Sequence, residues 1–206
     1  MKKLLYFLAF SFIISLSMTA QTLVSAEIQK NSSLTINGST NITPFKIYQN
    51  GDKLCRSKLS VVTTQNQNKT LISQNQLSVV VKNFDSNNAM ALKDFLKLLK
   101  SDSYPILQVQ LNYLDVQPIS EKGKIYTGEA LVNITITGKT KQYIIPITFN
   151  STGDVYTVNG CKKLSIRDFG LTPETKMLGM IKVSEWIKID FHIICKISID
   201  NEVAKL

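Results

Sequence analysis

The segment from residue 183 to residue 199 constrains the fold more than any other part of this chain. Its odd-numbered positions are almost all apolar, and they read Val183, Glu185, Ile187, Ile189, Phe191, Ile193, Cys195, Ile197 and Ile199. The even-numbered positions between them are mostly polar. Because successive side chains of a strand point to opposite faces, this pattern predicts one long strand with one apolar face. A strand of about fifteen residues, where about five or six is usual, is typical of a barrel or a strongly bent sheet.

Shorter alternating runs, separated by turn residues, fill most of the rest of the chain. They lie at residues 34–38, 45–47, 55–61, 77–81, 107–113, 130–136, 143–149 and 155–167. These runs are rich in Val, Ile and Thr, which favour strands. The two runs on either side of Gly138 predict a hairpin with a short loop. About seven to nine strands joined by short links predict an all-β, antiparallel sandwich or barrel.

Residues 88–100 break the strand pattern. Apolar side chains recur there at spacings of three and four, with lysines on the other side; the apolar set is Met90, Leu92, Phe95, Leu96 and Leu99. This spacing predicts one short amphipathic helix of about three turns. Ser86 or Asn87 is its expected N-cap. The simplest interpretation is that the helix closes one end of the core.

The first residues have the pattern of an export signal. Lys2 and Lys3 precede an apolar run at residues 4–16, and small and polar residues follow. This order predicts a secretory signal peptide, and the run is too short to span a bilayer comfortably. Two cleavage points fit, after Ala20 and after Ala26, so we expect a signal peptide of residues 1–20 or 1–26 and a single domain over residues 27–206. The predicted location is the periplasm or the outside of the cell.

The positive charge of the chain is spread along its length. The formal net charge of +9 falls to +7 without Lys2 and Lys3, because residues 1–20 contain no acid. No run of like charges has the length typical of a nucleic-acid-binding arm, so we expect no nucleic-acid partner. Two interpretations remain for the excess: a solvated surface, or weak attraction to an anionic membrane surface.

The chain has few residues suited to catalysis or metal binding. His192 is the only histidine, and no two of Cys55, Cys161 and Cys195 are close enough for a zinc motif. The sequence has no serine elbow, phosphate loop or helical metal motif, so we expect no catalytic residues, no metal and no cofactor. In an oxidising compartment three cysteines predict one disulfide and one thiol, and the sequence leaves the pairing open.

The tripeptide at residues 168–170, Asp-Phe-Gly, has a structural interpretation. It follows the strand expected at residues 155–167. Gly170 permits a turn there, and we expect Asp168 to cap exposed backbone amides.

Several landmarks occur in a recognisable order. They are residues 83–90 (Asn-Phe-Asp-Ser-Asn-Asn-Ala-Met), a lysine-bearing helix ending Leu99-Lys100, residues 103–106 (Ser-Tyr-Pro-Ile), residues 138–141 (Gly-Lys-Thr-Lys), residues 168–171 (Asp-Phe-Gly-Leu) and the long last strand. In this order the chain resembles the YceI-like family of bacterial exported proteins over roughly residues 33–199. The resemblance implies a lipocalin-like, eight-stranded antiparallel barrel with one short amphipathic helix at about 88–100. It also implies an apolar lipid ligand in the lumen, such as a polyisoprenoid or isoprenoid quinone.

The sequence departs from the pattern of that family in two places. The helix has a single acidic residue, Asp94, and lacks the histidine often seen near the methionine at position 90. The stretch from Asp168 to Val183 offers no obvious site for a polar head group. The resemblance therefore leaves both the role of the helix and the position of the polar end of the ligand undefined.

Two functions follow from these expectations. From the residues alone, the apolar face of the last strand serves equally a packed core or a ligand cavity, and the resemblance favours the cavity. The predicted function is a periplasmic or secreted protein that binds an apolar lipid, with no enzymatic activity. The alternative is a cell-envelope β-sandwich interaction module with a filled core and no small ligand. Candidate lumen contacts are Ile187, Ile189, Phe191 and Ile193 on the last strand, with Phe45, Phe84, Met90, Phe95 and Phe169 at the mouth or the helix-covered end.

Overall fold

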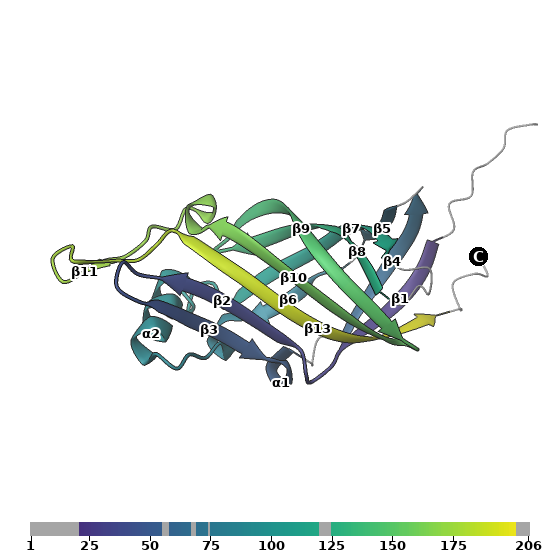
Figure 1. Cartoon of the computed structure of the whole chain (residues 1–206), viewed down its shortest axis with the longest axis horizontal. Helices are drawn as coiled ribbons and strands as arrows, with labels where there is room; N and C mark the ends of the chain where they lie inside the picture. Colours follow the sequence, from purple (N-terminus) through teal and green to yellow (C-terminus); the bar gives the residue numbers. More distant parts are fainter. Residues whose placement is uncertain (1–20, 55–57, 67–68, 74, 120–124, 201–206) are drawn as a thin grey trace, which may run out of the picture.

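The structure, a computed structural model, describes residues 21–54, 58–66, 69–73, 75–119 and 125–200 (Figure 1). In chain order its elements are β1 (Gln21–Ile28), β2 (Ser33–Ser39), β3 (Pro44–Asn50), α1 (Gly51–Leu54), β4 (Lys58–Asn66), β5 (Lys69–Ser73), β6 (Leu77–Val80), the 3-10 helix η1 (Val81–Asn83), α2 (Ala89–Leu98), β7 (Ile106–Pro118), β8 (Ile125–Ile136), β9 (Lys139–Thr152), β10 (Val155–Ser165), the 3-10 helix η2 (Ile166–Phe169), β11 (Thr175–Lys176), β12 (Ile181–Lys182) and β13 (Trp186–Asp200). The predicted signal peptide lies outside the described residues. None of the helices within the described ranges is long and apolar enough to cross a membrane.

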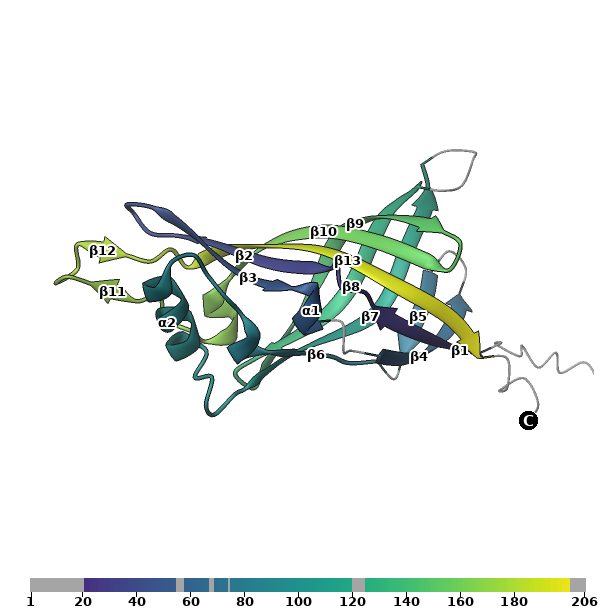
Figure 2. The ribbon, with the colours of Figure 1, turned by 90° about the horizontal axis from the view of Figure 1, so that it is seen from below.

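Eight strands close into a ring. Their order is β1-β4-β5-β7-β8-β9-β10-β13, and β13 pairs back onto β1. Every pairing in the ring is antiparallel. The predicted eight-stranded antiparallel barrel is therefore confirmed. The figures show the strands curving around a common axis, with α2 at one end and the C-terminal end of β13 at the other (Figures 1 and 2).

The long last strand, β13, holds the barrel together along its whole length. One edge of β13 pairs with β10 from Trp186 to Lys196. The other edge is divided between two partners, with β2 along residues 188–192 and β1 along residues 195–200. The strand must be long because it spans two successive partners, and its length agrees with the alternation in the sequence.

At the end of the barrel near α2, the wall is completed by β3, β6 and the segment that leads into α2. β3 and β6 border this end without pairing to each other, since β3 pairs with β2 and β6 pairs with β7. Beside β3, the backbone N–H groups of Tyr48 and Asp85 each donate to the other residue's carbonyl, at 2.9 and 2.8 Å. Helix α2 packs next to this bridge, and its Phe95 ring meets Phe84 edge-on at 5.2 Å between ring centroids.

The predicted helix is present, but its predicted N-cap is wrong. The cap is Asn88, whose side-chain oxygen accepts from the N–H of Ala91 at 3.0 Å. The two predicted caps are used elsewhere. The hydroxyl of Ser86 donates to the carbonyl of Lys46 at 2.6 Å, and the side chain of Asn87 accepts from the hydroxyl of Tyr48 at 3.2 Å. Both tertiary contacts fix the loop before the helix against β3.

The predicted hairpin at Gly138 is confirmed. Ile136 of β8 pairs with Lys139 of β9 across a two-residue turn. Thr137 and Gly138 both have positive φ, 47° and 77°. This is the backbone shape of a type I′ turn, which matches the twist of the strands and favours glycine.

Candidate functional site

A cavity of about 740 Å³ occupies the lumen of the barrel. Pockets for small ligands have volumes of about 300–1,000 Å³, so the lumen is large enough for one. All nine predicted site residues line it: Ile187, Ile189, Phe191 and Ile193 on β13, and Phe45, Phe84, Met90, Phe95 and Phe169 around the end near α2. Contact between these residues and a ligand stays a prediction.

The lumen is open rather than filled by side chains. Ile187, Ile189, Phe191 and Ile193 point inward from β13, yet each keeps part of its surface accessible. Other lumen residues are fully packed, for example Ile47 with 0% of its surface exposed and Phe169 with 1%. Packed protein interiors leave few voids larger than a water molecule. The inner face of β13 therefore borders a cavity, not a close-packed core.

Most polar groups on the wall of the lumen already have partners. The side chain of Asn75 is bonded twice to the backbone of Leu111, accepting from its N–H at 2.8 Å and donating to its carbonyl at 2.6 Å. These bonds satisfy the backbone groups of Leu111 on β7 at the point where the register between β7 and β8 shifts. Asn88 is occupied as the cap of α2. Because polar groups that already have partners within the protein gain little from a ligand, the lumen favours an apolar molecule.

Lys162 is the cationic residue on this wall. It lies on the inward face of β10 between Gly160 and Leu164. Its ammonium group donates to the carbonyl of Ile144 on β9 at 2.9 Å. This bond spans a split in the barrel, because the β9–β10 pairing ends at Gly160 and Ile147.

The helix η2 sits where β9 and β10 separate. Phe169 is buried there, with its ring centroid 6.2 Å from that of Tyr143 on β9. The hydroxyl of Tyr143 donates to Asp168 at 2.8 Å. Partial burial, and secondly the hydrogen bond and charge of Asp168, raise the pKa of Tyr143 well above its usual value. The tripeptide at residues 168–170 thus seals the split wall.

One expectation for this tripeptide is confirmed and one is wrong. Gly170 ends η2 with φ of 70°, the left-handed conformation expected of a turn glycine. Asp168, predicted to cap backbone amides, accepts from the side chain of Tyr143. The capping oxygen belongs to Ser165, which accepts from the N–H of Arg167 at 3.2 Å. The long reach of tyrosine from a neighbouring strand is invisible in the local sequence.

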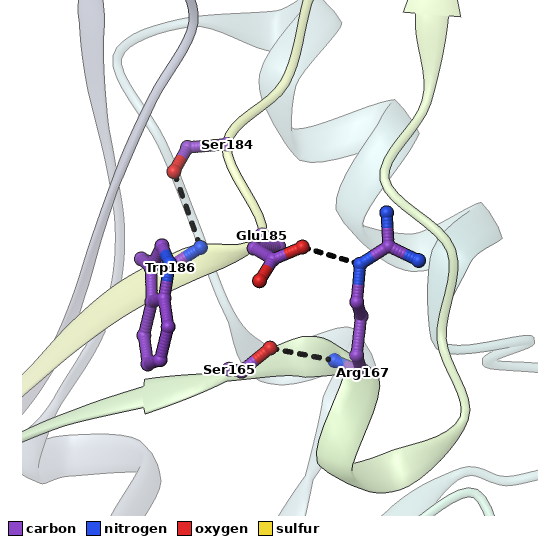
Figure 3. A network of polar contacts seen from close by, with 5 residues as sticks. All are labelled: Ser165, Arg167, Ser184, Glu185 and Trp186. Carbon is purple, nitrogen blue, oxygen red and sulfur yellow. Dashed lines mark hydrogen bonds and ion pairs between the residues drawn. The ribbon is translucent and has the colours of Figure 1, made fainter.

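A polar network ties η2 to the start of β13 (Figure 3). Arg167 forms an ion pair with Glu185, and the N–H of Ile166 donates to the carbonyl of Glu185 at 2.9 Å. The hydroxyl of Ser184 accepts from the N–H of Trp186 at 3.1 Å. Glu185 was the one charged residue in the predicted apolar register. Glu185 precedes β13, which begins at Trp186, so it is not part of the alternating strand and is paired with Arg167 instead.

Comparison with known proteins agrees with this architecture. Residues 20–195 match the model of the YceI-like domain. The chain belongs to the YceI-like family. This identification confirms the resemblance drawn from the sequence landmarks. Among curated proteins, none matches the chain.

Two solved structures share the YceI-like fold at low sequence identity. BcnA from Burkholderia cenocepacia is 19% identical, with a TM-score of 0.51 over 84% of this chain and 95% of that one. A domain from Saccharophagus degradans, described as polyisoprenoid-binding and implicated in plant cell wall breakdown, is 9% identical. Its TM-score is 0.57 over 83% of this chain and 97% of that one. At these identities the likeness concerns the fold alone.

The cysteines of this YceI-like protein do not form the expected disulfide among the described residues. Cys161 and Cys195 are both free, and Cys55 lies outside the described ranges. Cys161 is opposite Asp190 and Cys195 is opposite Tyr156, so the two are five positions apart along the β10–β13 pair. They also face opposite sides of the sheet, because Cys195 lines the lumen and Cys161 does not. Burial raises the pKa of the Cys195 thiol to about 11.

Sequence reasoning missed lumen residues from most other strands. Ile47, Val132, Ile134, Ile145, Ile147 and Leu164 all line the cavity and are buried. A signal for them existed, since each lies in a run whose alternation predicted a strand. The polar residues at the end near α2 had no such signal. Glu174 lines the cavity and forms an ion pair with Lys97 of α2 at 3.1 Å, a contact across a long sequence separation. Within the described ranges, no group of three or more acidic, histidine or cysteine residues is placed to hold a metal ion.

Proposed function

We propose that this protein is an exported carrier that holds one apolar, isoprenoid-type lipid in the lumen of its barrel. The observation that carries the proposal is the cavity of about 740 Å³, lined by the inward faces of the barrel strands. Support for the lipid class comes from the Saccharophagus degradans domain, which is described as polyisoprenoid-binding and has the same fold. The pattern of residues 1–20 supports a periplasmic or secreted location.

The energetics of the lumen support an occupant. The apolar lining of this cavity of about 740 Å³ lacks partner atoms on its inner side, and an apolar chain in the lumen would supply those contacts. Water gains little from apolar walls, whereas each buried CH₂ group of a lipid contributes about 0.8 kcal/mol. The alternative of a filled interaction module conflicts with the open inner face of β13.

Solvent extraction of the purified mature protein, followed by mass spectrometry, tests this proposal. We expect an apolar lipid with an isoprenoid chain, close to one per protein. Protein stripped of lipid should take up an added prenol or quinone and should melt at a higher temperature when loaded, because a ligand that binds only the folded state stabilises it. Recovery of no lipid, together with no uptake, would refute the proposal.

Alkylation of Cys195 gives a second readout at the cavity itself. Cys195 lines the lumen, whereas Cys161 lies outside it on the neighbouring strand. A small maleimide at alkaline pH, where the thiolate forms, should label Cys195 more slowly in the lipid-loaded protein than in the stripped protein. Labelling of Cys161 should be the same in both forms and serves as the matched control. Equal labelling of Cys195 in both forms would place the lipid outside the lumen.

A further inference from the structure

Five exposed apolar side chains gather at the end of the barrel near α2. Ile42 is at the β2–β3 turn and Met90 in the first turn of α2, and Met177, Leu178 and Met180 form the β11–β12 turn. Ile42 is 68% exposed and Leu178 is fully exposed. We call these five residues the apolar rim. Figure 2 shows the β11–β12 hairpin, the β2–β3 turn and α2 together at this end, with the hairpin projecting furthest. A gathering of exposed apolar residues marks an interaction surface.

The two hairpin tips of the apolar rim are fixed to each other. Asn41 makes three hydrogen bonds to the β11–β12 hairpin. Its backbone N–H donates to the carbonyl of Lys182 at 3.1 Å, and its side-chain amide donates to the carbonyl of Met180 at 2.9 Å. The side-chain oxygen accepts from the N–H of Lys182 at 2.8 Å. The rim is therefore held in place, not presented by a loose loop.

The residues of the β11–β12 turn contradict ordinary turn chemistry. Met177, Leu178 and Gly179 all have positive φ, at 47°, 56° and 94°. Asn, Asp and Gly are the residues that adopt this conformation readily and keep a turn polar. Methionine and leucine there are both strained and exposed to water. Such a choice is accounted for by a partner that accepts apolar side chains.

Continuity with the lumen and nearby charge indicate which partner this is. Ile42 and Met90 belong to the rim and also line the cavity, so the apolar surface runs from the tips into the barrel. Lys46, Lys93 and Lys182 lie on the same three elements, with exposed side chains and no ion-pair partner within the described ranges. Apolar tips beside exposed lysines match the interface of an anionic bilayer.

We propose that the apolar rim docks onto an anionic lipid bilayer, with the β11–β12 turn in the headgroup region and the lumen opening onto the membrane. An apolar ligand would then pass between bilayer and barrel without crossing water. This purpose rests on the proposed function, but docking itself does not depend on a bound lipid and is measured without one.

Flotation of lipid-stripped protein with vesicles tests the proposal. Vesicles of phosphatidylglycerol and phosphatidylcholine should bind the protein, and high salt or pure phosphatidylcholine should weaken binding because the lysine contribution is screened or lost. The double variant Leu178→Ser/Met180→Ser should bind at least tenfold more weakly. Ile125→Ser is the matched control, since Ile125 is 52% exposed and starts β8 at the opposite end of the barrel. Its binding should equal that of the original protein.

Three results would overturn membrane docking. They are no binding to anionic vesicles, equal binding by the rim variant, and loss of binding in Ile125→Ser. A dimer in solution that the rim variant dissolves, with no vesicle binding, would assign the rim to a second copy of the chain instead. The rim variants alter exposed residues, so melting and prenol uptake should stay unchanged. Loss of vesicle binding with intact uptake separates failure of docking from failure of the carrier function.

Discussion

Ile189 offers a sharp test of the lumen, because a charge placed there meets a known neighbour. In the β10–β13 pair Ile189 lies directly opposite Lys162, and both residues line the cavity. Replacement of Ile189 by lysine puts two ammonium groups side by side on the same inner wall. Replacement by glutamate puts a carboxylate in the same place beside Lys162. Glutamine is the neutral control of similar length.

The magnitude follows from the spacing of the two positions. Side chains directly opposite each other in an antiparallel pair have Cβ atoms about 4.5–5.5 Å apart. Two unit charges about 5 Å apart interact by roughly 3 kcal/mol at an effective dielectric constant of about 20. All three variants lose the apolar contacts of Ile189. Relative to the glutamine variant, the lysine variant should then be less stable and the glutamate variant more stable. Long side chains that reach along the open lumen reduce both effects. We expect the free energy of unfolding of the glutamate variant to exceed that of the lysine variant by at least about 2 kcal/mol.

Urea unfolding of the three variants, with prenol uptake measured on each, provides the assay. Both charged variants should take up less prenol than the original protein, because a charge against an apolar chain is unfavourable. Equal stability of the lysine and glutamate variants would show that position 189 does not face Lys162. The inward assignment of the whole β13 face would then be wrong.

Two further substitutions probe the split between β9 and β10. Tyr143→Phe should lower stability by about 1 kcal/mol at neutral pH, the value of one hydrogen bond. Because the pKa of Tyr143 is raised in the folded state, this contribution is complete below the unfolded pKa of about 10 and is lost as pH rises through the folded pKa. The difference in stability between the two proteins, measured in urea, should therefore begin to shrink above about pH 10. A constant difference would contradict the contact with Asp168. In Gly160→Ala the new Cβ would collide with the ring of Phe191, and the ring must then turn into the lumen. Prenol uptake should therefore fall, and it should recover when Phe191→Leu is added. Unchanged uptake in Gly160→Ala would place that ring elsewhere.

Most strands and their facing could be predicted because they follow a two-residue period, whereas β1 and β5 were not among the predicted strands. That period depends on which side chains are buried, and burial inside a barrel leaves a clear alternation in sequence. The inward register of Ile187, Ile189, Phe191 and Ile193 followed from it directly. The hairpin at Gly138 also followed, since its turn needs a residue that tolerates positive φ.

The sequence could not reveal features set by contacts between distant elements. Asn88 caps α2 because Ser86 and Asn87 are bonded to β3, which only the folded chain shows. The gap between β9 and β10 has no marker, because both strands keep their alternation past the point where they part. The open state of the lumen was equally hidden. Alternation tells which side chains point inward, not whether they meet.

The last prediction concerns the mature N-terminus, for which the sequence left Ala20 and Ala26 open. Strand β1 begins at Gln21, pairs with β4 along residues 21–27 and pairs with β13 along residues 23–28. Val24 and Ala26 also line the lumen. Cleavage after Ala26 would remove most of β1, and the ring would open between β4 and β13 with two unpaired strand edges.

We therefore predict cleavage after Ala20, with Gln21 as the first residue of the exported protein. Intact-mass measurement of protein recovered from the exported fraction checks this directly. A mature chain that starts at Glu27 would contradict the role of β1 in closing the barrel, and a chain that retains residues 1–20 would contradict export. As an independent check, recombinant protein starting at Gln21 should melt cooperatively. Protein starting at Glu27 should melt at a much lower temperature or fail to fold, because β13 then lacks a partner along residues 195–200.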